Sequence, residues 1–334
     1  MTAVVLLSLA LGSDWHIGGT GYFKAIPRRY FQVTPWGEFL LLNPEARYLA
    51  RFSADGQRLE NIGRPGQGPG EFSMPFDVFC EGENIYLHEF WLGKVLVYGR
   101  DGTYLETIQQ PAFGIRLYRI SNGWMYFQTG GLQTEQSRLV RTDADFENAK
   151  VLLAWPVNRK SATSFNPFLD IFILARSGSK ENYFCYRPGI FRIDSVNPFT
   201  SETEPFFESD APPIAVEPAH IAAWKKDPDR DRSSAFPVSF PDHFPPIKDM
   251  FWTPTGHLCV IRGAPPGTNI PVLLLSAHGE PEKRPWDAGA LASFLGAWDG
   301  WAYFSDAGGE ETAIVRIPAA DFESRVMQAS PGGR

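Results

Sequence analysis

Cysteine is scarce in this sequence, with only three among 334 residues. Cys80, Cys185 and Cys259 lie far apart, and no pair has the CxxC spacing of a zinc or redox site. An odd number of thiols cannot all pair within one chain, so a dense disulfide framework is excluded. We expect three small buried residues, with a single disulfide as the alternative.

Positive charge is not in excess either. The chain carries 31 Lys and Arg against 38 Asp and Glu, which gives a formal net charge of −7. A general nucleic-acid binder needs a basic face to offset the charge of the phosphates. The charge balance therefore predicts that nucleic acid is not the partner.

Long hydrophobic runs are absent, apart from AVVLLSLAL at residues 3–11. This run is too short to cross a bilayer, so no transmembrane span is expected. It resembles the apolar core of a secretory signal, although no Lys or Arg precedes it. Residues 1–13 are interpreted as the remnant of a signal peptide or as an edge strand. A signal would place the protein outside the cytoplasm, in the periplasm or secreted.

Aromatic and turn-forming residues, by contrast, are abundant. The chain contains 26 Phe, 11 Tyr and 10 Trp, together with 31 Gly and 28 Pro. An apolar content of 43% is enough to form a core, which excludes a disordered chain. Gly and Pro are spread throughout, which disfavours a helical bundle. The composition therefore predicts short strands with frequent reversals.

Two segments of similar pattern, residues 31–62 and 76–108, follow one another in the first third of the chain. Each reads as four short strands with a D-G turn before the last one, at Asp55-Gly56 and Asp101-Gly102. The two turns are 46 residues apart. Weaker copies of the unit recur around Asp143, Asp194 and His278, and the segment 314–323 closes the series.

Six such units predict an all-β protein, a six-bladed β-propeller of four-stranded antiparallel blades. A unit of four strands repeated every 40 to 50 residues buries its faces by stacking against its neighbours in a ring. The step from Asp194 to His278 is 84 residues, about twice the usual spacing, so seven blades are the alternative. We expect one propeller domain over 14–323 and a flexible tail over 324–334.

The same long step contains a proline-rich stretch. Residues 197–246 hold ten of the 28 prolines, and proline cannot donate a hydrogen bond to a neighbouring strand. We therefore expect an insertion at about 199–243, with a helical turn over 219–224. Long insertions in compact domains often lie over a functional face.

The junction between the first two units resembles that of NHL-type propellers, and more closely that of six-bladed propellers from bacterial envelopes. The matching residues are Gly66, Gly68, Gly70, Glu71 and Phe72, then Pro75, Asp77 and Val78, then Ile85, Tyr86 and Leu87. The resemblance implies a propeller fold and a location outside the cytoplasm. It implies no particular activity.

No catalytic motif is present. The segment RPGQGPGEF at 64–72 is rich in glycine but lacks the G-K-[ST] of a phosphate-binding loop. No G-x-S-x-G occurs, and the six histidines do not have the spacing of a zinc site. The sequence therefore favours binding over catalysis and requires no cofactor.

One set of charged residues remains as a candidate site. In a six-bladed ring, the innermost strands begin around a central channel, and aligning the units places five residues there. They are Arg29, Asp77, Arg116, Asp170 and Asp249. Lactonase-like propellers hold calcium at this place with clustered oxygen ligands. Here two guanidinium groups would repel a cation, so we expect charged side chains that pair with one another, with calcium as the alternative.

The sequence thus predicts a monomeric binding or scaffold module. It would hold a protein, peptide or saccharide at its loop face or at the mouth of the channel. The alternative is a calcium-dependent propeller hydrolase or lyase of the lactonase-like kind.

Overall fold

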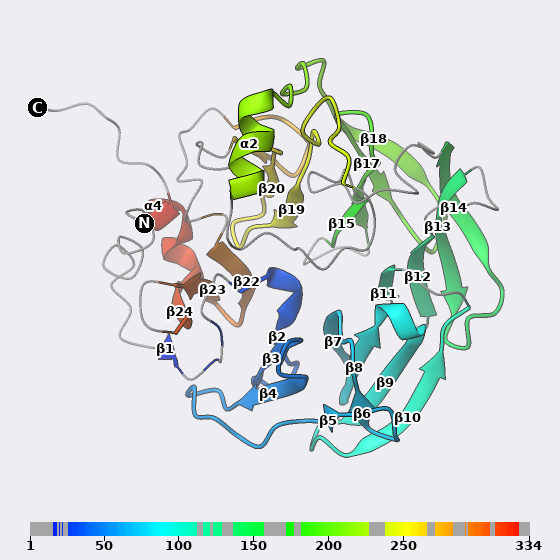
Figure 1. Cartoon of the computed structure of the whole chain (residues 1–334), viewed down its shortest axis with the longest axis vertical. Helices are drawn as coiled ribbons and strands as arrows, with labels where there is room; N and C mark the ends of the chain where they lie inside the picture. The colour runs from blue at the N-terminus through cyan, green and yellow to red at the C-terminus, as the bar shows by residue number, and fades with distance from the viewer. Residues whose placement is uncertain are drawn as a thin grey trace, which may run out of the picture. The chain divides into compact units, whose positions relative to one another are not determined.

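The computed structural model contains six principal β-sheets in the part of the chain that it describes, one for each predicted blade (Figure 1). The described residues are 16–18, 20, 22, 26–111, 116–120, 123–128, 136–156, 172–176, 182–226, 238–265, 271–282, 291, 293–307 and 311–326. Four of these sheets have four strands and two have three. The fold is an all-β six-bladed propeller with four-stranded antiparallel blades.

Four sheets are complete. They consist of β7 (Asp77–Glu81), β8 (Asn84–Glu89), β9 (Lys94–Gly99) and β10 (Tyr104–Gln109); β11 (Arg116–Ile120), β12 (Gly123–Gln128), β13 (Gln136–Asp143) and β14 (Lys150–Pro156); β15 (Ile173–Arg176), β16 (Tyr183–Tyr186), β17 (Arg192–Val196) and β18 (Thr203–Glu208); and β22 (Phe294–Trp298), β23 (Trp301–Asp306), β24 (Ala313–Pro318) and β1 (His16–Ile17).

The other two sheets have three strands each. They consist of β2 (Phe31–Val33), β3 (Phe39–Asn43) and β4 (Tyr48–Phe52), and of β19 (Asp249–Trp252), β20 (Leu258–Ile261) and β21 (Val272–Leu275). Isolated bridges, Leu49 to Ile62 and Leu275 to Pro281, stand where a fourth strand would pair. The remaining elements are β5 (Arg64–Pro65), β6 (Glu71–Phe72), η1 (Arg28–Tyr30), η2 (Phe90–Leu92), α2 (Pro218–Lys226), η4 (Ala319–Asp321) and α4 (Phe322–Val326).

The prediction of six blades is confirmed, and the alternative of seven is wrong. Between β18 and β19 the described residues form α2 and the isolated bridge from Ala215 to His243 but no further sheet. The long step in the repeat is therefore a long connection. Asp194, around which a weaker copy of the unit recurs, lies within β17 and is buried, and Arg187 and Arg192 pair with its carboxylate at 2.7 and 2.8 Å.

The proline-rich stretch begins with a strand, since β18 occupies residues 203–208. After it, the chain is held by backbone hydrogen bonds from Val216 N to Asp242 O and from Phe244 N to Ile214 O, both 2.8 Å long. The helical turn expected over 219–224 is part of α2.

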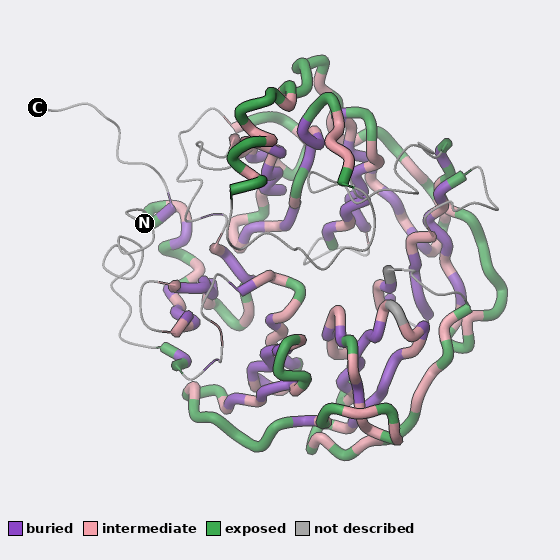
Figure 2. Tube along the Cα trace, in the orientation of Figure 1, coloured by how far each residue is buried: buried purple, intermediate pink, exposed green. Residues whose placement is uncertain are grey.

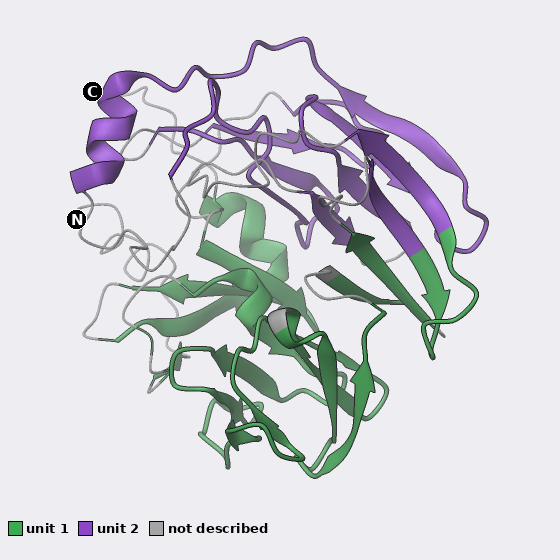
Figure 3. Ribbon diagram, turned by 45° about the vertical axis from the view of Figure 1, so that its right-hand side comes forward, with its two compact units in different colours: residues 1–128, 141–150, 289–334 green, residues 129–140, 151–288 purple. Residues whose placement is uncertain are grey.

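The chain divides into two compact units, which Figure 3 shows in two colours. Unit 1 comprises residues 1–128, 141–150 and 289–334, and unit 2 comprises residues 129–140 and 151–288. In unit 1, β1 pairs with β24, with His16 opposite Val315, so a strand from the beginning of the chain completes the sheet formed near its end.

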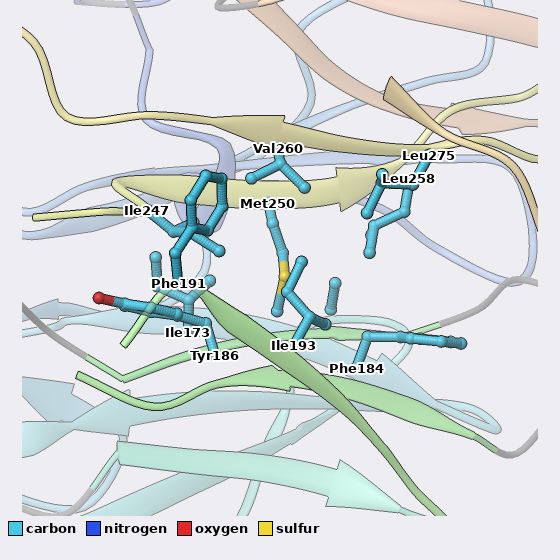
Figure 4. Packing of buried hydrophobic residues seen from close by; sticks show 11 residues of the cluster. Ile173, Phe184, Tyr186, Phe191, Ile193, Ile247, Met250, Leu258, Val260 and Leu275 are labelled. Atoms are coloured by element: carbon cyan, nitrogen blue, oxygen red, sulfur yellow. The ribbon is translucent and has the colours of Figure 1, made fainter. Parts of the chain in front are cut away.

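Each unit has aromatic and branched side chains packed between neighbouring sheets. In unit 1, Leu40 and Leu42 of β3 pack with Leu87 of β8. In unit 2, Met250 of β19 points toward Ile193 of β17 (Figure 4). Central strands such as β8 are buried because sheets cover both of their faces, whereas the outer strand β10 consists of partly buried and exposed residues (Figure 2).

The two D-G turns are confirmed. Gly56 and Gly102 have φ values of 86° and 89°, which L side chains rarely adopt. At Gly102 the space is also restricted, because an added Cβ would lie 3.1 Å from Cγ1 of Ile62. This glycine therefore lets the β9–β10 turn pack closely against the preceding repeat.

None of the three cysteines, all of which are described, forms a disulfide, so the alternative of a disulfide is wrong. Burial raises the pKa of Cys80 to about 12 and raises that of Cys185 as well. Among the described residues, no helix is long and apolar enough to cross a membrane.

Candidate functional site

The strand register of β7–β10 defines two ends of this sheet. Asp77 lies opposite His88, and Glu89 lies opposite Lys94; we call this the loop end, because η2 connects β8 to β9 there. At the other end Asn84 lies opposite both Glu81 and Gly99; we call this the turn end. The charged side chains described below are assigned to the loop end or to the turn end of this sheet.

Arg29 reaches the loop end from η1, the short 3-10 helix before β2. Pro27 precedes the helix with an extended backbone, and the N–H of Tyr30 donates to the Pro27 carbonyl at 2.9 Å. Arg28 Nε donates to the carbonyl of Phe294 at 3.1 Å, at the start of β22. These contacts fix η1 beside the first strands of two sheets of unit 1, and the neighbouring Arg29 side chain remains exposed.

The Arg29 guanidinium lies over two aromatic rings. Its Cζ is 4.6 Å from the ring centroid of Tyr30 and 5.0 Å from that of Phe76, and its Nη2 donates to the Tyr30 hydroxyl at 3.0 Å. A cation over an aromatic face is attracted by the ring quadrupole. No carboxylate among the described residues pairs with Arg29.

Phe76 is held in place from two sides. Its backbone N–H donates to the carbonyl of His88 at 2.8 Å, and its ring lies 4.9 Å from that of Phe90, with the planes tilted by 30°. The ring of the fully buried His88 meets Phe76 edge-on at 6.0 Å. We call Arg29, Tyr30, Phe76 and Phe90 the Arg29 patch.

A buried ion pair supports the chain that leads to Phe76. Glu89 is completely buried, and its Oε1 accepts hydrogen bonds from the backbone N–H groups of Ser73 at 2.7 Å and Met74 at 2.8 Å. Its Oε2 lies 2.9 Å from Nζ of Lys94. The carboxylate therefore fixes the backbone of residues 73–74, while Met74, two residues before Phe76, remains 50% exposed.

Tyr22 adds a rigid neighbour to Tyr30. The two ring centroids are 6.4 Å apart, and the Tyr22 hydroxyl donates to the carbonyl of Leu42. Burial is the main cause that raises the pKa of Tyr22 above its usual range. Tyr22 therefore stays neutral, and Arg29 carries the charge of the Arg29 patch.

Comparison with known proteins agrees with this architecture. Residues 38–233, more than half of the chain, match the family described as 6-bladed beta-propeller, DUF5128. The chain belongs to this propeller family.

Two solved structures share the propeller fold over most of both chains. The "Putative exported protein" from Bacteroides fragilis is 14% identical, with 91% of this chain and 94% of that chain covered and a TM-score of 0.59. A DUF4221 family member from Bacteroides vulgatus is 9% identical, with the same coverage and a TM-score of 0.55. Identities this low show a common fold alone. No curated protein matches the sequence.

Among the predicted site residues of this propeller, Arg29 and Asp77 lie at the loop end of unit 1. They do not pair with each other, which differs from the expected pairing of charges: Arg29 lies over aromatic rings, and Asp77 Oδ1 accepts the N–H of Val78 at 3.0 Å. The predicted site consisted of charged residues alone and did not include the aromatic residues that adjoin them in the sequence.

Of the other three predicted residues, Asp249 is the one whose side chain is described. Asp249 begins β19 in unit 2, opposite Ile261. Arg116 begins β11, but its side chain lies outside the described residues, as does the whole of Asp170. Within the described part of the chain, no three His, Cys, Asp or Glu side chains gather as a metal-binding group would.

Sequence reasoning missed Tyr30, Phe76 and Phe90. Two of them are direct neighbours of predicted residues, since Tyr30 follows Arg29 and Phe76 precedes Asp77. An aromatic residue next to a predicted charged residue was therefore the sequence signal that could have indicated the patch. The stacking itself joins residues 47 positions apart, and no local pattern indicates it.

Proposed function

We propose that this propeller is a binding module, and that it holds an acidic peptide segment of a protein at the Arg29 patch. The observation that carries the proposal is the exposed Arg29 guanidinium over two aromatic rings, with no carboxylate partner among the described residues. A guanidinium presents five N–H donors in a planar fork, and among the described residues one of them is used, by the Tyr30 hydroxyl. The remaining donors match the two oxygens of a carboxylate.

The surroundings of Arg29 favour a ligand with an apolar group next to its acidic group. Phe76 and Phe90 form an aromatic pair beside the guanidinium, and Met74 is exposed two residues before Phe76. Arginine and aromatic residues are the types that contribute most to protein recognition. A short peptide with an acidic and an aliphatic or aromatic side chain would use both features.

The patch is also preorganised. Phe76 is fixed by the backbone of His88, and the chain before it by the buried carboxylate of Glu89. Side chains that are already ordered lose less conformational entropy when a ligand binds. We propose further that the protein acts outside the cytoplasm, which the apolar run at 3–11 supports.

The proposal is tested with two matched peptides, N-acetyl-Asp-Phe-Leu-amide and its Asn counterpart, by isothermal titration calorimetry. The acidic peptide is expected to bind more tightly, and Arg29→Gln is expected to weaken it by about tenfold, which corresponds to about 1.4 kcal/mol. Phe76→Leu should weaken the binding of both peptides alike, since it removes the aromatic ring and leaves the charge of Arg29 in place.

Arg64→Gln is the matched control. Arg64 is also an exposed arginine of unit 1, with 77% of its side chain accessible, but it pairs with Glu71 at 2.8 Å. This variant should bind both peptides as the wild type does. Equal affinity of the wild type and Arg29→Gln for the acidic peptide would overturn the proposal, as would the absence of any binding.

A further inference from the structure

A second polar site lies at the turn end of unit 1, away from the Arg29 patch. It is an open groove of about 490 Å³, lined by Arg51, Glu83, Asn84, Gly99, Arg100 and Asp101. These residues come from β4, from the β7–β8 turn and the start of β8, and from the end of β9 with its following turn. The volume lies within the range of small-molecule sites, which is about 300–1,000 Å³.

One guanidinium in the groove is held rigidly. Arg51 donates from Nε and Nη2 to the two carboxylate oxygens of Glu38, at 3.0 and 3.1 Å, and from Nη1 to the backbone carbonyl of Asp101 at 3.0 Å. Only 14% of its side chain is accessible. Arg51 thus connects the first repeat to the turn of the second and gives the groove a fixed wall.

One carboxylate is held in the same way. Asp101 Oδ1 accepts the backbone N–H of Thr103 at 2.9 Å, and Oδ2 accepts its hydroxyl at 2.8 Å. These hydrogen bonds lower the pKa of Asp101, so the group is ionised at neutral pH. Gly99 leaves room for this arrangement, because an added Cβ would lie 3.1 Å from Asp101 Oδ1.

The other charged pair, Arg100 and Glu83, is long and exposed to solvent. Arg100 Nη1 and Glu83 Oε1 are 3.8 Å apart, and 53% and 80% of the two side chains are accessible. Arg100 also lies over the ring of Trp36, with Cζ 5.4 Å from the centroid. Both ends of this pair are therefore available to a ligand without breaking a strong contact.

The chemistry of the lining selects the class of ligand. Two guanidiniums face two carboxylates, so the formal charges cancel, and Asn84 adds an amide with both donors and acceptors. A charged ligand would meet equal numbers of attracting and repelling groups. An apolar ligand would find no apolar side chain among the residues that line the groove. Hydroxyl groups, which donate and accept, match every one of these side chains.

We propose that this groove binds a neutral saccharide. The proposal is independent of the acidic peptide proposed for the Arg29 patch, because the two sites lie at opposite ends of the β7–β10 strands. The hydroxyl groups of a saccharide would form hydrogen bonds with Arg51 and Asp101, which are held in place, and with Glu83 and Arg100, which are exposed and can adjust.

The test uses maltose, cellobiose and N,N′-diacetylchitobiose, titrated into the full chain by calorimetry and followed by tryptophan fluorescence. We expect at least one of them to bind at millimolar concentration or below, with an affinity that salt changes little. Glu83→Gln and Arg100→Gln should each weaken that binding by about tenfold or more. Both side chains are exposed, so the variants should fold, and melting curves check this. Trp36→Phe should reduce the fluorescence change.

Arg64→Gln and Arg29→Gln are the controls, and neither should alter saccharide binding. The proposal is overturned if none of the three disaccharides binds, or if Glu83→Gln and Arg100→Gln bind them as the wild type does. It is equally overturned if sodium acetate, tetramethylammonium chloride or glycine competes for the groove as well as the sugar does, because the ligand would then be charged. Loss of peptide binding in Arg29→Gln with unchanged sugar binding would separate the two sites.

Discussion

Glu89 and Lys94 form a buried ion pair at the loop end of the β7–β10 sheet, with 2.9 Å between Oε2 and Nζ. The other oxygen of Glu89 holds the backbone N–H groups of Ser73 and Met74. One carboxylate therefore joins two strands to the segment that carries Phe76, and the Arg29 patch depends on it.

Replacing this carboxylate should destabilise the fold. We expect Glu89→Gln to lower the free energy of unfolding by about 3 kcal/mol, because it leaves the ammonium of Lys94 without its buried partner. Urea denaturation measures the change. Glu83→Gln is the matched control, since its pair with Arg100 is exposed and 3.8 Å long, and it should cost less than about 0.5 kcal/mol. Equal effects of the two substitutions would contradict the structural role given to Glu89.

The β9–β10 turn should not tolerate a side chain at Gly102. Its φ of 89° strains any L residue, and a Cβ would contact Ile62, so we expect Gly102→Ala to cost about 2 kcal/mol. Gly82→Ala provides the comparison: its φ is 57°, but an added Cβ would meet nothing within 4 Å. Thermal or urea unfolding should therefore show a smaller loss for Gly82→Ala, because its φ lies in the ordinary left-handed region and its Cβ has space, whereas Gly102→Ala combines backbone strain with the contact to Ile62.

Asp101 should contribute to stability in a pH-dependent way. Hydrogen bonds from Thr103 lower its pKa in the folded state, so the contribution is complete above the pKa of the unfolded chain, about 3.9. It is lost as the pH falls through the lower value of the folded state. Melting temperatures from neutral to acidic pH should fall less steeply for Asp101→Asn than for the wild type. Parallel curves at acidic pH would show that Asp101 makes no such contribution.

The thiols should be unreactive in the native protein. Cys185 and Cys259 are fully buried, and burial raises the pKa of Cys80 to about 12, so little thiolate forms at pH 8. With Ellman's reagent we expect almost no reaction under native conditions and all three thiols in guanidinium chloride. Rapid reaction of one thiol without denaturant would show that its site opens.

Calcium tests the alternative function, a calcium-dependent hydrolase or lyase. A ligand that binds the folded state alone raises the melting temperature by mass action. We expect the same melting temperature in calcium chloride and in EGTA. A calcium-dependent increase that disappears in Asp77→Ala or Asp249→Ala, together with turnover of a lactone substrate, would favour the enzyme instead.

Local sequence determined the strands and turns of this protein. Glycine at the D-G turns is required by the backbone itself, since φ values near 86° and 89° strain other residues. The repeat of these turns, with the apolar strands between them, was enough to predict six blades. It also placed Arg29 before a first strand and Asp77 at the beginning of one, as the structure does.

Only the tertiary structure decided which side chains meet. Arg29 stacks on Phe76, which belongs to the next repeat, and Arg51 binds the carbonyl of Asp101, 50 residues later. Such contacts depend on the register and packing of neighbouring sheets, and a local pattern of residue types contains neither. The sequence therefore determined that this chain forms a propeller, and the packing of one blade against the next decided where it presents a cation on aromatic rings and where it presents a neutral polar groove.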